Sequence, residues 1–336
     1  MRFAELIGQE LASGVLRRAI REDRIAHAYL FAGPEGTGKL TAALAFAAAL
    51  NCESLDSSGD GCGNCTSCRM AASGNHADVE IISPDGAETK IKQMREMRRT
   101  AFYAPLRGKW KVAIIEQADT LNEESSSAIL KILEEPPAYL VIIVLSRNPA
   151  LLLATIRSRC LLIRFSQVRV EDMARALVER FGATEEDARF LAAYSEGRPG
   201  CAIRLLGNDS FFEWRRQLTE LAAAISTEDR RRALRLSEEL QRLAGVRKED
   251  GQTQRAAMRS ALQLLSLWYR DLLNLSVRGQ AAELINTDLR ERLVSIRSDA
   301  GAASAAIETL LWACRVIEGN ANVQLTSDVT VMRLMA

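Results

Sequence analysis

The sequence predicts an α/β fold with a parallel five-stranded sheet, followed by a helical remainder. A glycine-rich turn over residues 33–39 lies between an apolar run and an Ala/Leu-rich stretch, which is the strand–loop–helix order of a phosphate-binding loop. Short apolar runs recur up to residue 165 with helical patterns between them, and this alternation is typical of parallel sheets. After residue 170 no strand pattern recurs, so the rest of the chain is expected to be helical.

Length and composition indicate a globular protein of two or three domains. The chain has 336 residues, of which 48% are hydrophobic and 26% charged. Lys and Arg number 44 against 43 Asp and Glu, a net charge of +1, so any DNA contact must be local. Because the N-terminus lacks a signal-peptide pattern and no run approaches the about 20 apolar residues of a membrane span, we expect a cytoplasmic protein with no membrane partner.

Five apolar runs supply the predicted strands. They are residues 28–32, 79–82, 111–115, 141–145 and 161–165. Helical patterns precede and separate these runs, which indicates a first domain over residues 1–166. Two amphipathic helices, 170–181 and 184–197, indicate a small helical domain over residues 167–208. Four or five longer helices are expected in a third domain, residues 209–336.

The glycine-rich turn departs from a complete phosphate-binding loop at one position. In G-x-x-x-x-G-K-[ST], backbone N–H groups wrap the phosphates, the lysine reaches the outer phosphates and the hydroxyl holds Mg²⁺. Leu40 occupies the hydroxyl position, and Thr41 is one residue late, about 100° around a helix. The predicted nucleotide contacts here are Gly33, Gly36, Gly38 and Lys39. This site is expected to cradle phosphates but to hold Mg²⁺ poorly.

A second departure follows the third strand. A working ATPase places an Asp on Mg²⁺ and a Glu beside the attacking water after this strand, whereas this chain has Glu116 and Gln117. An amide cannot accept the proton of water, so hydrolysis loses a general base worth roughly 10²–10⁴-fold. We predict a degenerate site, with Glu116 as a further contact, that does not hydrolyse ATP. The sequence leaves open whether ATP or ADP binds at all.

Four cysteines predict a structural zinc site. Cys52, Cys62, Cys65 and Cys68 contain two C-x-x-C steps with glycines between, a pattern that can close a tetrahedral thiolate site. In a reducing compartment such clusters bind metal more often than they form disulfides. Free thiols or a redox pair are the alternatives.

A basic helical stretch follows the cysteines and contains Lys90, Lys92, Arg95, Arg98 and Arg99. These side chains form either a solvated helix face or a weak local contact to DNA.

Several segments together resemble a known family. They are residues 7–9, 27–31, 33–39, the four-cysteine module, 131–137 and 155–160. The chain resembles the AAA+ clamp-loader subunits of bacterial DNA polymerase III, with the delta-prime type the most similar. The resemblance covers residues 1–166 in motifs and the helical remainder only in layout.

The resemblance implies a subunit of a five-membered arc that opens a sliding clamp and closes it around primed DNA. ATP in the gamma/tau motor subunits drives this reaction. The implied partners are the gamma/tau and delta subunits, the clamp and primed DNA, all within the DNA polymerase III holoenzyme. The two helical domains are implied to be a lid and a collar. The Ser158-Arg159-Cys160 motif implies that Arg159 is an arginine finger, acting on ATP bound by a neighbour.

Three hypotheses compete at this point. The first is a stator with no ATPase of its own that acts through Arg159, and the second is an active gamma/tau-type motor. Gly200 opposes the motor, because it stands where the family's motors carry a sensing arginine, and Pro199 fixes the backbone between it and Arg198. The third is a zinc-dependent nucleic-acid-binding module. The stretch 52–69 opposes this hypothesis, because Arg69 is its only basic residue.

Overall fold

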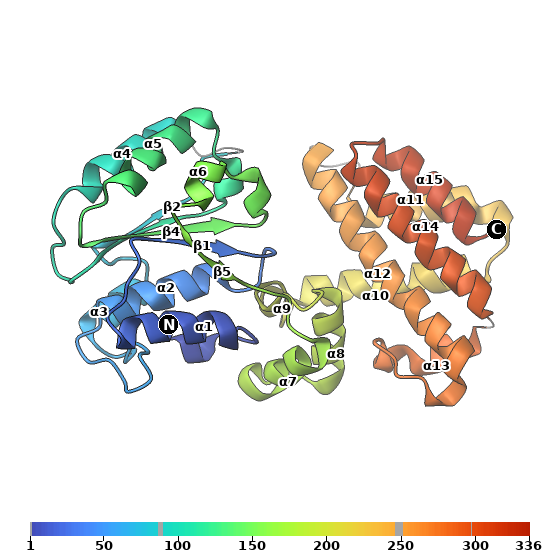
Figure 1. Cartoon of the computed structure of the whole chain (residues 1–336). Helices are drawn as coiled ribbons and strands as arrows, with labels where there is room; N and C mark the ends of the chain where they lie inside the picture. Colours follow the sequence, from blue (N-terminus) through green and yellow to red (C-terminus); the bar gives the residue numbers. More distant parts are fainter. Residues whose placement is uncertain (1, 87–89, 246–250, 297) are drawn as a thin grey trace. The chain divides into compact units, whose positions relative to one another are not determined.

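The chain folds into two compact units. The structure is a computed structural model that describes residues 2–86, 90–245, 251–296 and 298–336 (Figure 1). The first unit comprises residues 1–173 and 197–201, and the second comprises residues 174–196 and 202–336. The predicted small helical domain, residues 167–208, is therefore distributed over both units. A separate third domain stays a prediction.

All five predicted strands form one parallel sheet in the first unit. The strands are β1 (Ala28–Ala32), β2 (Val79–Ile82), β3 (Lys111–Ile115), β4 (Leu140–Ser146) and β5 (Leu161–Arg164). Their order is β2-β3-β4-β1-β5, and every neighbouring pair is parallel. The central strands β1 and β4 are buried at every position, as their continuous apolar runs predict. The predicted α/β fold is confirmed.

Two apolar layers cover the sheet. Alternate residues of β1 point to opposite faces: Tyr29 and Phe31 join a cluster with α1 (Glu10–Arg21) and α2 (Lys39–Leu50). Ala28 and Leu30 join a cluster with the helices on the other face. Those helices are α4 (Ile91–Ala101), α5 (Glu123–Glu134) and α6 (Ala154–Arg157). Figure 1 shows α1 and α2 on one side of the sheet and α4, α5 and α6 on the other.

Short elements complete the first unit. They are the 3-10 turns η1 (Phe3–Glu5), η2 (Ala118–Thr120) and η3 (Pro149–Leu151), and helix α3 (Thr66–Ala72), which belongs to the cysteine module. The carboxyl ends of the parallel strands share one edge of the sheet, where the glycine-rich loop also starts. This edge carries the nucleotide-site residues.

The three helices after the sheet differ in part from the prediction. Helix α7 (Val170–Phe181) has the predicted bounds, whereas α8 (Glu185–Tyr194) ends three residues before the predicted end at 197. Glu196 and Gly197 have positive φ angles of 52° and 69°, which the right-handed helix excludes. Helix α9 (Pro199–Leu205) was not predicted. It begins at a proline, which is well tolerated at the first helical position.

Long helices build the remainder of the second unit, as predicted. They are α10 (Asp209–Thr227), α11 (Ala233–Leu243), α12 (Gly251–Arg278), α14 (Ala300–Glu318) and α15 (Val323–Leu334), with the short α13 (Arg290–Ser295) and three 3-10 turns, η4 (Arg230–Arg232), η5 (Gly279–Ala281) and η6 (Thr287–Leu289). Asp271 on α12 is fully buried and accepts hydrogen bonds from the backbone of Ile285 and Asn286. The Asn286 side chain in turn accepts a hydrogen bond from Arg215 of α10. This buried network fixes the segment between α12 and α13.

Helix α14 is apolar enough to qualify as a membrane span by length and composition. It has 19 residues, but these include the charged residues Glu308, Arg315 and Glu318, so the helix is not a continuous apolar run. The helix packs against α12 and α15, and the buried side chains Ala303, Ala306, Leu310, Ala313 and Ile317 share one face. A packed helix of a protein core meets the same criteria. This single helix does not indicate a membrane protein.

Candidate functional site

The glycine-rich loop connects β1 to α2 with the expected backbone geometry. Gly36 and Gly38 have φ angles of 79° and 93°, in the left-handed region that favours glycine. The backbone N–H of Gly200 donates to the Gly36 carbonyl at 2.8 Å. A β-carbon added at Gly36 would lie 2.6 Å from Sγ of Cys201. The start of α9 therefore packs directly on the loop, through the backbone of Gly200 and the side chain of Cys201.

Lys39 folds back onto its own loop. Its Nζ donates to the carbonyls of Gly33 at 2.6 Å and Pro34 at 2.7 Å. Burial lowers the pKa of Lys39 to about 8, and the nearby carboxylates of Asp119 and Glu35 oppose this shift. A bound phosphate would replace the neutral carbonyl acceptors with negatively charged oxygens, which attract the ammonium group more strongly. The lysine can therefore serve as a phosphate ligand.

Leu40 and Glu116 occupy the two positions that hold Mg²⁺ in a complete site, and both side chains make other contacts. Leu40 packs against the apolar cluster beneath α2. Glu116 accepts a hydrogen bond from the Ser83 hydroxyl at 2.5 Å. Gln117 has a left-handed backbone, with φ 45°. Residue 40 therefore has no oxygen to bind Mg²⁺, and the carboxylate at residue 116 already accepts a hydrogen bond.

Three charged residues at this edge were missed by the sequence analysis. The Asp119 carboxylate accepts hydrogen bonds from the Ser146 hydroxyl at 2.5 Å and the Arg147 backbone N–H at 2.7 Å. The Arg147 guanidinium contacts Glu35 of the loop at 3.3 Å and lies 3.9 Å from Asp119. Their positions after the strands were the available signal in the sequence. Asp119 lies shortly after the end of β3, and Arg147 is the first residue after β4. Parallel strand ends bring such residues together only once the strand order is known.

The hydrogen bonds of Arg159 are to residues outside this charged cluster. Its guanidinium donates to the Thr155 carbonyl and to Glu134, both at 3.0 Å. The side chain is 36% exposed. These contacts fix the guanidinium at the corner between α6 and β5 and leave part of it accessible from outside the chain.

The four cysteines come together as predicted. Their Sγ atoms all lie within 4.8 Å of one another, and the Cys52–Cys65 and Cys62–Cys68 distances are both 4.0 Å. A tetrahedral zinc with Zn–S bonds of about 2.3 Å separates its sulfurs by about 3.8 Å, so the arrangement fits one ion. Disulfides require about 2.05 Å. None of the described cysteines is in a disulfide.

Backbone N–H groups support thiolates in this cluster. Those of Cys65 and Asn64 donate to Sγ of Cys62 at 3.3 and 3.4 Å and lower the pKa of that thiol to about 6. Burial raises the pKa of Cys68, which a metal ion would reverse by binding the thiolate. The module also holds the N-terminus, because Asp60 accepts hydrogen bonds from the backbone of Phe3 and Ala4.

The basic helix α4 is a partly neutralised surface. Lys90 pairs with Asp85 and Arg99 pairs with Glu96, whereas Lys92 and Arg95 are exposed. The apolar side of the helix packs onto the sheet. The charge pattern suits a solvated face, and a DNA contact stays a prediction.

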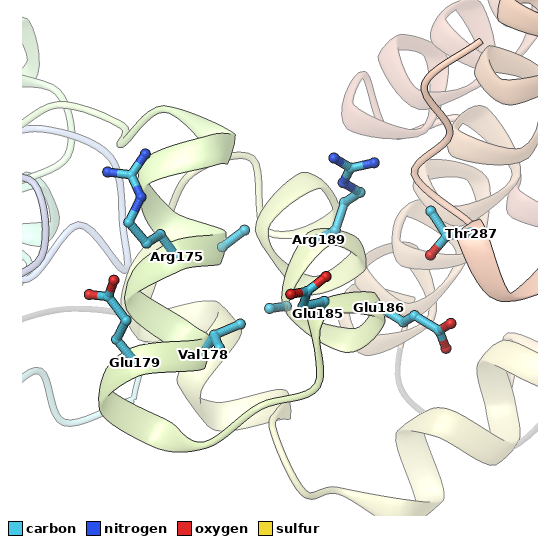
Figure 2. A pocket seen from close by; sticks show the side chains of 9 residues that line it. Arg175, Val178, Glu179, Glu185, Glu186, Arg189 and Thr287 are labelled. Carbon is cyan, nitrogen blue, oxygen red and sulfur yellow. The ribbon is translucent and has the colours of Figure 1, made fainter. Parts of the chain in front are cut away.

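A separate cavity lies in the second unit. It has a volume of about 510 Å³ and is lined by α7, α8 and Thr287 (Figure 2). The charged lining residues are Arg175, Arg189, Glu179, Glu185 and Glu186. This mixture of signs selects no ligand class, and none of the predicted site residues lines the cavity.

Comparisons with known proteins show which proteins this chain is similar to. A family model described as "DNA polymerase III, delta subunit" matches residues 8–169. The delta' subunit of DNA polymerase III from Bacillus subtilis is 28% identical over 322 residues, which cover 95% of this chain and 94% of that protein. The chain is similar to clamp-loader subunits of DNA polymerase III. The resemblance noted in the sequence is confirmed.

Other clamp-loader subunits match a smaller part. The gamma/tau subunit of Mycobacterium tuberculosis is 39% identical over 158 residues, which cover 47% of this chain and 27% of that protein. The tau subunit of Escherichia coli is 37% identical over 176 residues, again 27% of its length. Among solved structures, a gamma-subunit-related protein of Thermotoga maritima has a TM-score of 0.48 at 17% identity, covering 96% of this chain and 98% of that one.

Proposed function

We propose that this chain is the delta-prime-type stator of the clamp loader. It helps to load the sliding clamp onto primed DNA and has no ATPase activity of its own. The observation that carries this proposal is a nucleotide loop without Mg²⁺ support, in a chain that presents Arg159 separately. Leu40, at the hydroxyl position, packs against the core cluster, and Gln117 stands in place of the general base. The similarity to the delta' subunit along 94% of its length supports the same role.

In this proposal Arg159 completes the ATP site of a neighbouring subunit. Guanidinium groups are always charged and match phosphate geometry, so they stabilise charge that develops during phosphoryl transfer. Glu134 and Thr155 hold the group in place. The proposed partners are the gamma/tau and delta subunits and the clamp, with the helical second unit as collar. Weak contacts to primed DNA through α4 belong to the same proposal.

The cysteine module is proposed to hold one structural zinc ion. Cys52, Cys62, Cys65 and Cys68 would supply all four ligands, which leaves no open position for a substrate or an activated water. The ion would therefore stabilise the fold of residues 52–72 and the attached N-terminus.

The motor hypothesis is the second candidate, and Lys39 with its glycines is the observation that favours it. One substitution separates the two. In a clamp loader reconstituted with this chain, Lys39→Ala is expected to change the ATPase rate by less than about twofold, because the hydrolysing sites lie in other subunits. The matched control removes the loop lysine of the gamma/tau subunit. A comparable loss from both substitutions would support the motor instead.

If the chain binds nucleotide without hydrolysing it, its affinity for that nucleotide should depend on pH. Phosphate binding needs the charged lysine, whose pKa in the free chain is about 8. The charged fraction of Lys39 falls about tenfold between pH 7 and pH 9, so the affinity for ADP is expected to fall by about the same factor. Isothermal titration at both pH values measures it. Lys39→Arg keeps its charge and should be nearly insensitive, and equal affinity of the unmodified chain at both pH values would contradict this assignment.

A further inference from the structure

A second cation faces the nucleotide loop from the neighbouring strand. Arg147 is the first residue after β4, and β4 pairs with β1, whose end begins the loop. The Arg147 guanidinium reaches across this edge to Glu35 within the loop, at 3.3 Å. Half of its side chain is exposed. It is therefore adjacent to the loop and accessible to a ligand bound there.

Arg147 and Lys39 both lie at the mouth of the glycine-rich loop. The charges of Asp119, Glu35 and Arg147 all influence the ammonium group of Lys39, so two cations and two carboxylates surround the mouth of the loop. The two carboxylates differ in how firmly they are held. Asp119 is nearly buried and accepts hydrogen bonds from Ser146 and Arg147. Glu35 is 60% exposed, and exposed ion pairs of this kind contribute little, so a ligand can displace it.

A divalent cation has poor support at this site. Residue 40 is a partly buried leucine that packs against the core cluster, and the Glu116 carboxylate accepts a hydrogen bond from Ser83. In a complete site, Mg²⁺ bridges the outer phosphates and neutralises part of their charge. Here that neutralisation has to come from side chains. Arg147 is placed to supply it, and its planar fork matches phosphate oxygens.

We propose that this site binds a nucleoside di- or triphosphate as a Mg²⁺-independent polyanion, with Lys39 and Arg147 as its two cationic ligands. Glu35 is the internal counter-ion that the phosphates displace from Arg147. This inference rests on the proposed non-hydrolysing nucleotide site, and it is independent of Arg159 acting on a neighbour. The bound nucleotide would link the loop to the end of β4 and so stiffen this edge of the sheet.

The test is equilibrium binding of ADP and ATP to the purified full-length chain, in excess EDTA and in excess Mg²⁺. Affinity in EDTA is expected to equal or exceed affinity in Mg²⁺. Arg147→Ala is expected to weaken binding by about tenfold or more, and Arg147→Lys by less, because it keeps the charge but loses the fork. Glu35→Gln is expected to tighten binding several-fold. Arg157→Ala, an exposed arginine at α6, is the matched control and should leave binding unchanged.

Three results would overturn the proposal. They are binding that requires Mg²⁺, an Arg147→Ala chain that binds as tightly as the unmodified chain, and no binding under any condition. A structural role of the Arg147–Glu35 pair predicts that Glu35→Gln is neutral or weakens binding, which separates that role from the proposed one. Failure here leaves the stator proposal standing, because the ATPase rate of the reconstituted complex tests that proposal separately.

Discussion

Replacing Arg159 by alanine is expected to leave the chain folded and assembled but to disable the ATP site of its neighbour. Arginine fingers accelerate phosphoryl transfer by about 10³–10⁵-fold in other systems, so hydrolysis at that one site should fall on the order of 10³-fold. Folding should be unaffected, because the guanidinium is partly exposed and pairs with an exposed carboxylate, Glu134. Such surface pairs contribute at most about 1 kcal/mol.

Single-turnover hydrolysis by the reconstituted clamp loader measures this effect at the affected site. Arg159→Lys keeps the charge without the planar fork and should recover only part of the rate. Arg157→Ala removes a nearby exposed arginine and is the matched control. Size-exclusion chromatography confirms assembly of each variant. A rate unchanged by Arg159→Ala would show that the guanidinium has only a structural role.

Removal of the zinc ligands is expected to have the largest effect on stability. Apparent binding free energies of structural zinc reach about 10–16 kcal/mol in small zinc-binding peptides. The buried cluster at this module is small and consists of Ala48, Ala71 and the ligand Cys68, with the other three cysteines packed against it. Cys65→Ser should therefore abolish metal binding and unfold the module. Release of Asp60 would also free the backbone of Phe3 and Ala4, which loosens the N-terminus.

Metal content and hydrogen exchange test this prediction. The unmodified chain should contain one zinc per chain, and Cys65→Ser should contain none and exchange rapidly over residues 52–72. Cys314→Ser alters a thiol outside the cluster and serves as control. An unmodified chain that purifies without metal, with the module still protected from exchange, would rule out a structural zinc.

The strands were predictable because their environment is simple. Strands such as β1 and β4 are buried on both faces, so each needs a continuous apolar run, and that run can be read locally. The cysteines were predictable for a related reason. The ligand spacing of a small metal module is local, so residues 52–68 contain the whole pattern.

The charged cluster at the sheet edge was not predictable from local patterns. Glu35, Asp119 and Arg147 come from three segments, and only the order β2-β3-β4-β1-β5 brings those segments together. A single sequence does not reveal which parallel strands pair. The buried contact of Arg215 with Asn286 was also not predictable, because it joins α10 to a segment 71 residues away and depends on how the helices pack. The end of α8 depends on the left-handed backbone of Glu196, a conformation that a non-glycine residue does not signal in the sequence.

The central claim is that this chain is a stator with no ATPase activity of its own. Steady-state ATP hydrolysis by the purified, zinc-replete chain, with Mg²⁺ and with or without primed DNA, tests it most directly. We predict no turnover above the background of a Lys39→Ala chain, because Leu40 offers Mg²⁺ no ligand and Gln117 cannot act as a base. Clear turnover that Lys39→Ala abolishes would contradict the claim and identify the chain as a motor.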